Sequence, residues 1–186
     1  MEHDEFWTIV ERARAAVDDT ATFEGAQAVA ERVVARLTEL GPAGAVEFQL
    51  VYDALERASY RNDLWAAAYL MCGGCSDDGF DYFRGWLVAQ GRTVWERALA
   101  DPDSLADVRV DPDEDAVWCE EMLAAAGDAY AAVTGDEEAF WAALKAAAPD
   151  PPKRGNNAPA GEDFDFDDDA QMRARLPRLA AIYLPE

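Results

Sequence analysis

The stretch MCGGCSDDGFDYFRGWLVAQGR, residues 71–92, decides the fold because it joins two helical patterns across a short break. Gly73 and Gly74 end the first pattern, and Ser76 stands where a helix N-cap is expected. Asp77 and Asp78 follow, and acidic side chains in a first turn suit the positive end of the helix dipole. The stretch therefore predicts the end of one helix and the start of another.

The second half of the stretch predicts an amphipathic helix. Phe80, Phe83 and Leu87 recur at steps of three and four, which places them on one face of a helix that ends near Gly91. We expect that face to be buried.

The same spacing recurs on both sides of this stretch. Gly41-Pro42 and Asp101-Pro102 predict helix ends, and residues 108–110 alone resemble a strand. The apolar residues that mark the other predicted helices are Phe6, Val10, Ala13 and Val17; Phe23, Ala26, Ala30, Val33, Leu37 and Leu40; Phe48, Val51, Leu55 and Ala58; Leu64, Trp65, Ala68, Met71 and Cys72; Trp95, Ala98 and Leu99; Trp118, Met122, Ala126 and Tyr130; Phe140, Trp141 and Leu144; and Met172, Leu176, Leu179 and Tyr183. The fold class predicted is all-α, a compact multi-helix, bundle-like domain with an acidic, loop-rich C-terminal extension.

Three segments are predicted along the chain. Residues 1–148 form the helical domain, residues 149–169 a linker or strap rich in proline and aspartate, and residues 170–186 a last helix that packs on the domain. Phe164 and Phe166 are the residues that can pin the strap, and Pro177 either opens or kinks the last helix.

Composition restricts the partners. The net charge of −22 over 186 residues argues against nucleic-acid binding through phosphate neutralisation and favours a basic protein as partner, if there is one. The chain has no stretch of about 20 apolar residues, and its acidic start is unlike a signal peptide, so we expect no membrane contact and a cytoplasmic protein. Three cysteines make no disulfide framework.

Several chemistries are excluded by residue type. His3 is the single histidine, which removes Ser-His-Asp, Cys-His and multi-histidine metal sites, and no nucleotide-binding glycine pattern occurs. An EF-hand counted from Asp111 has Ala116 and Met122 where glycine and glutamate are required. We therefore expect no cofactor and no metal.

The Cys72–Cys75 motif has three interpretations. A helix rather than a strand is predicted before it, so it differs from a thioredoxin-type motif, and no second paired motif completes a zinc site. Structural thiols are the favoured interpretation, with redox sensing or metal binding as alternatives.

Candidate binding residues lie on the helix after Ser76. Asp77, Asp81 and Arg84 share one helical face, so both acids are expected to hold Arg84, which is expected to stack on an aromatic ring. The rings considered are Tyr82, Trp86 and Trp95. A structural ion pair is one interpretation, and a ligand site is the other. No catalytic residue is identified, and the candidates for ligand or partner binding are Asp77, Asp78, Arg84, Trp86, Gln90 and Arg92.

These residues also carry a resemblance. FW at residues 6–7, LW at 64–65, AAYLM at 67–71 and GGCSDDGFDYFRGWLVAQGRTVWERALADPDSL at 73–105 resemble the domain of unknown function 4240 family of small bacterial proteins. The resemblance covers about Glu5 to Leu105, and Cys72 departs from its pattern. It implies a helical fold and no particular reaction. The positions that it carries over are Asp77, Asp78, Phe80, Phe83, Arg84, Trp86, Leu87 and Gly91, and more loosely Trp7, Trp65 and Pro102.

Three functions follow as expectations. The first is a protein-binding module of regulatory or conflict-system (immunity-like) type, which neutralises a basic effector. The second is an enzyme or small-molecule binder in which Arg84 and Arg92 grip an anion while Asp77 or Asp78 acts as acid or base. The third is a subunit of a larger assembly that docks through its acidic tail.

Overall fold

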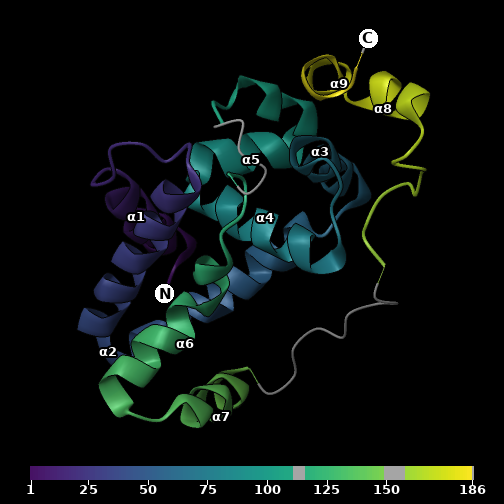
Figure 1. The fold of residues 1–186 in the computed structure, drawn as a ribbon. Coiled ribbons are helices and arrows are strands. Elements are labelled where there is room, and N and C mark those ends of the chain that lie inside the picture. Colours follow the sequence, from purple (N-terminus) through teal and green to yellow (C-terminus); the bar gives the residue numbers. More distant parts are fainter. Residues whose placement is uncertain (111–115, 149–157, 186) are drawn as a thin grey trace.

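The fold is built from helices in residues 1–110, 116–148 and 158–185, which are the residues that this computed structural model describes (Figure 1). The elements are α1 (His3–Arg14), α2 (Phe23–Ser59), α3 (Asn62–Cys72), α4 (Asp77–Ala89), α5 (Arg92–Ala100), the 3-10 helix η1 (Pro102–Asp107), α6 (Glu120–Thr134), α7 (Glu137–Ala147), α8 (Asp169–Arg175) and α9 (Pro177–Tyr183). Over these three ranges there is no β-strand, and residues 108–110 are irregular. The all-α prediction is confirmed, and the suggestion of a strand at residues 108–110 is wrong.

Helix α4, the helix predicted from the opening stretch, lies at the centre of the fold (Figure 1). The Gly79 N–H donates to the Ser76 hydroxyl oxygen at 3.1 Å, which confirms Ser76 as the N-cap. Phe80, Phe83 and Leu87 are fully buried. Because α4 packs against α1, α2, α3, α5 and α6, its sequence sets the positions of most of the domain.

Helix α2 contains the break that Gly41-Pro42 predicts. Gly41 has φ +75° and ψ −176°, outside helical geometry, and Pro42 opens the next turn. Helix α2 packs against α1 and along α6. Two helical segments therefore follow each other where the periodicity predicts two helices.

Three helix ends differ from the predictions. Helix α1 ends at Arg14, before Val17. Trp118 precedes α6, because the next residue, Cys119, donates its N–H to the Tyr82 carbonyl oxygen at 3.0 Å. The last predicted helix is two helices, α8 and α9, and Pro177 opens the second of them.

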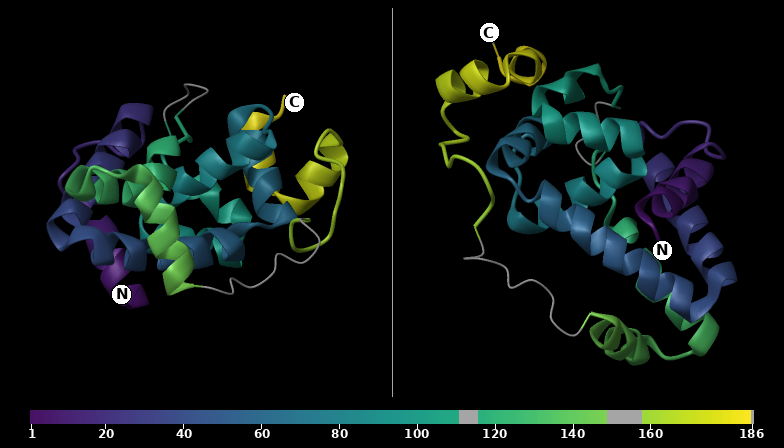
Figure 2. Two further views of the ribbon diagram at one scale, coloured as in Figure 1. Left: turned by 90° about the horizontal axis from the view of Figure 1, so that it is seen from below. Right: turned by 180° about the vertical axis from the view of Figure 1, so that it is seen from behind.

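The C-terminal helices lie far from α7. Helix α9 packs against η1 and α3, whereas α7 packs against α6 and α2 at the other end of the molecule (Figure 2). Residues 149–157 of the predicted linker lie outside the described residues. In the part of the chain that the structure describes, no helix has the length and apolar character required to cross a membrane.

Candidate functional site

Arg84 is buried, and its guanidinium group points from α4 toward the end of α2. Nη1 donates to the Glu56 carbonyl oxygen at 2.7 Å and lies 3.2 Å from Glu56 Oε2, and Nη2 pairs with Asp81. The guanidinium carbon lies 5.2 Å from the Tyr60 ring centroid and 5.0 Å from that of Phe80. Arg84 therefore sits between two rings and two carboxylates.

This geometry corrects the predicted surroundings of Arg84. Asp81 is a partner as expected, but the second acid is Glu56 and not Asp77. The stacked rings are Tyr60 and Phe80, not Tyr82, Trp86 or Trp95. Glu56 is in the last turn of α2, whose final carbonyl groups lack partners within the helix. The buried guanidinium group of Arg84 donates a hydrogen bond to one of these carbonyl groups, and its positive charge complements the negative end of the helix dipole.

Glu56 has an unusual acidity. Burial raises the pKa of its carboxyl group to about 7, although Arg84 opposes the shift. Burial also raises the pKa of Tyr52, one helical turn earlier and close enough to be influenced by Glu56. The Tyr52 hydroxyl and Glu56 Oε1 make no hydrogen bond of ordinary geometry with described residues. The cluster can hold a proton near neutrality inside the core.

The other candidates on α4 and α5 are separated from one another. Asp77 and Asp78 are exposed on the first turn of α4, and Trp86 is fully buried. Gln90 is also buried, and its Nε2 donates to the Thr20 carbonyl oxygen at 3.0 Å. The structure gathers none of these four around Arg84.

Arg92 holds α1 against α5. Its side chain pairs with Asp4 at 2.6 Å and with Glu96 at 2.7 Å, and its N–H donates to Glu11 Oε1 at 2.9 Å. Arg84 and Arg92 bind carboxylates from different elements of the protein. The arrangement therefore does not point the two guanidinium groups at one shared anion.

The Cys72–Cys75 pair follows a helix, as predicted. Cys72 ends α3, and the Trp118 indole N–H donates to its sulfur at 3.4 Å. A hydrogen bond with Cys72 and burial raise the pKa of the Cys75 thiol far above its ordinary value. Such a thiol stays protonated and unreactive at neutral pH. Among the described residues no three histidine, cysteine or acidic side chains are grouped to hold a metal, and residues 111–115 lie outside those residues.

The segment of residues 158–168, here called the strap, lies along α3 and is attached at its beginning. The Asn62 N–H donates to the Ala160 carbonyl oxygen, and the Ala160 N–H donates to that of Tyr60, both at 2.9 Å. These bonds flank an isolated bridge between Arg61 and Ala160. The strap therefore begins beside the junction of α2 and α3.

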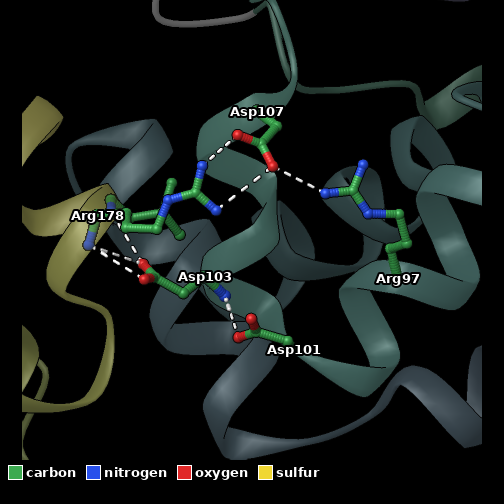
Figure 3. A network of polar contacts seen from close by, with 6 residues as sticks. Arg97, Asp101, Asp103, Asp107 and Arg178 are labelled. Atoms are coloured by element: carbon green, nitrogen blue, oxygen red, sulfur yellow. Dashed lines mark hydrogen bonds and ion pairs between the residues drawn. The ribbon is translucent and has the colours of Figure 1, made fainter.

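Helix α9, which follows the strap and α8, is fixed to η1 by a polar network (Figure 3). The buried Asp103 carboxylate accepts from the N–H groups of Arg178 at 3.1 Å and Leu179 at 2.9 Å. The Arg178 side chain pairs with Asp107, which also binds Arg97 at 2.8 Å. Because the strap is attached at its beginning and the helix that follows α8 is attached to η1, the strap is held in place over α3.

An open groove of about 410 Å³ lies between the strap and α3 and is called the strap groove. Phe166 lies across α3, with its ring centroid 6.4 Å from that of Trp65 and 5.7 Å from that of Tyr69. The Tyr69 hydroxyl donates to Asp167. The groove is lined by Asn62, Trp65, Tyr69, Cys75, Pro159, Asp163, Phe164, Asp165, Phe166 and Asp167. Partly exposed rings thus stand beside exposed carboxylates.

The sequence identifies the aromatic residues on the strap side of this groove but not those on the α3 side. Phe164 and Phe166 are expected to pin the strap, and they do pack against the core. Trp65 is treated only as part of a helical pattern and of the family resemblance, and Tyr69 only as part of the AAYLM motif. Their spacing of four residues nevertheless puts two large rings on the same face. That face is where the strap lies.

Comparison with known proteins places the chain in a family. No curated protein and no solved structure matches it. A family model does match, over residues 1–132. The match extends past Leu105 through most of α6 and stops before the strap and the last two helices. The chain belongs to the family described as protein of unknown function, DUF4240.

Proposed function

We propose that this protein is a cytoplasmic binding module, of regulatory or conflict-system type, that captures a basic segment of another protein in the strap groove. The observation that carries the proposal is the lining of that groove by four aromatic residues and three aspartates. Residues 158–169 contain six acidic residues and no basic one.

This lining suits an arginine or lysine side chain. A cation attracts the faces of aromatic rings, and the strap carboxylates add ion pairs at the rim. Because the strap is anchored before and after the groove, little conformational freedom is lost when a partner binds. The net charge of −22 would steer a basic partner toward the protein.

The anion-gripping alternative receives less support from the geometry. Arg84 and Arg92 are both occupied by carboxylates of the protein itself, and Arg84 is buried. An incoming anion would have to displace those partners.

The proposal is tested with an eight-residue peptide of alternating arginine and glycine. Calorimetry measures its affinity, and NMR follows the indole N–H of Trp65 together with the strap amides. We expect these signals to shift on binding. The double variant Asp163→Asn/Asp165→Asn should bind at least about tenfold more weakly, since each lost charge-assisted contact contributes roughly 1 kcal/mol or more.

A matched variant distinguishes binding in the strap groove from non-specific attraction by the protein's negative charge. Glu137→Gln/Glu138→Gln removes the same charge from the exposed first turn of α7, far from the strap. It should retain affinity within about twofold. Association rates of the wild-type protein should fall sharply between low and physiological salt. Equal losses in the two double variants would mean diffuse attraction and would refute the groove as the binding site.

A further inference from the structure

A second groove lies between α1 and the part of α2 on both sides of the break at Gly41. Its volume of about 540 Å³ lies in the range of small-molecule sites. Helix α1 and the first half of α2 lie on the side of the molecule away from α8 and α9 (Figures 1 and 2). This α1–α2 groove is therefore separate from the strap groove.

The α1–α2 groove concentrates positive charge in a strongly acidic protein. Three of the chain's fourteen arginines line it, namely Arg12 from α1 and Arg32 and Arg36 from α2. Arg36 pairs with Glu39 at 2.7 Å, an exposed contact that is readily exchanged. The side chains of Arg12 and Arg32 form no ion pair or hydrogen bond with the residues that the structure describes. These two guanidinium groups are thus available to a ligand.

The rest of the groove is largely apolar. Ile9 and Ala13, one turn apart on α1, form part of its wall, and Leu40 contributes from α2. Leu40 is 39 % exposed, which is unusual for a large aliphatic side chain in this protein. Ile9 and Ala13 are already buried, so an apolar body in the groove would remove mainly Leu40 from water, which is favourable.

The two ends of the groove differ in charge. Glu5 and Glu47 line one end, where the amino group of Met1 pairs with Glu47 at 2.8 Å. Arg12 follows Glu5 by seven residues on α1, about 10 Å along a helix axis. A negative group is therefore repelled from the glutamate end and attracted to the arginine end.

We infer that the α1–α2 groove binds a small amphipathic anion, a molecule with one carboxylate or phosphate head on an apolar body. Arg12 and Arg32 bind the head, because the planar guanidinium forms paired hydrogen bonds with either oxyanion. Ile9, Ala13 and Leu40 contact the body. This site is independent of the strap groove and of its basic partner.

Calorimetry with decanoate and decyl phosphate, both below their micellar concentrations, tests the inference. Decanol and decyltrimethylammonium serve as neutral and cationic analogues of the same chain length. We expect the protein to bind at least one anion and to bind both analogues at least about tenfold more weakly. The double variant Arg12→Gln/Arg32→Gln should reduce anion affinity by at least about tenfold.

Two further variants test whether binding occurs in the groove itself. Arg57→Gln removes the same type of charge from an exposed site in the last turn of α2, outside the groove, and should leave affinity unchanged. Ala16→Trp should block binding without a change of charge, because exposed Ala16 lines the groove. Unfolding curves check that each variant is folded. The inference is overturned if neither anion binds at millimolar concentration, if decanol binds as well as decanoate, or if Arg57→Gln weakens binding as much as the double variant.

Discussion

Replacement of Arg84 with alanine should destabilise the protein, and the cost can be worked out from its contacts. The variant removes a guanidinium that lies between two rings and bonds to the Glu56 carbonyl and carboxylate. Breaking a buried ion pair by deleting one partner costs roughly 3–5 kcal/mol. The exposed contact with Asp81 adds at most about 1 kcal/mol. We expect a loss of about 4 kcal/mol at pH 8.

The same reasoning predicts that the loss depends on pH. Because burial raises the pKa of Glu56 to about 7, its carboxyl group is largely protonated at pH 5.5 even in the wild-type protein. No full ion pair is then left to break, so the loss should be smaller by about 1 kcal/mol. For a chain of this length, 4 kcal/mol corresponds to a fall in Tm of about 8–16 °C.

Urea unfolding at pH 5.5 and pH 8 measures both effects. Arg57→Ala is the matched control, since Arg57 is exposed on the same stretch of α2 that Arg84 contacts, and it should change stability by less than about 1 kcal/mol. Arg84→Lys keeps the charge but lacks the planar fork, so it should fall between alanine and wild type. A fully stable Arg84→Ala, or a loss identical at the two pH values, would refute a structural role coupled to Glu56.

Three shorter predictions concern stability. First, the free energy of unfolding should fall as pH rises from about 4.5 to 7, because the raised pKa of Glu56 makes the folded state bind a proton more tightly; Glu56→Gln should flatten this part of the urea-derived profile. Second, Gly85→Ala should cost about 2–4 kcal/mol in a thermal unfolding assay, since the added Cβ would lie 2.3 Å from the Cys119 carbonyl oxygen. Gly127→Ala, whose nearest neighbours lie at 3.6 Å, should be neutral or stabilising in the same assay. Third, Asp103→Ala should cost about 1–2 kcal/mol and accelerate hydrogen exchange of the α9 amides that Asp103 caps, and unchanged exchange there would contradict the capping role.

The helices themselves are predictable because their determinants are local. Ser76 caps α4 through an atom three residues away, and Gly41 leaves helical geometry where Gly-Pro predicts it. The predictions fail where contacts between residues distant in the sequence determine where a helix begins. Trp118 fits the periodicity of α6, yet the next residue bonds to Tyr82 and the helix starts later.

The candidate site is less predictable because its parts are distant in the chain. The sequence singles out Arg84 but not Glu56, which is 28 residues away on another helix. It predicts that Phe166 pins the strap but not that Tyr69, 98 residues from Asp167, forms the opposite wall of a groove. Helical periodicity describes one element at a time and does not say which elements meet.

The attachment of α9 to η1 has a consequence for synthesis on the ribosome. Leu179 and Ala180 of α9 are buried, so the surfaces of α3 and η1 against which α9 packs remain bare until the end of the chain has been translated. A nascent chain that ends at residue 132, where the family match stops, would expose these apolar surfaces to chaperones. Burial of these surfaces of α3 and η1 is therefore completed only after α9 has emerged.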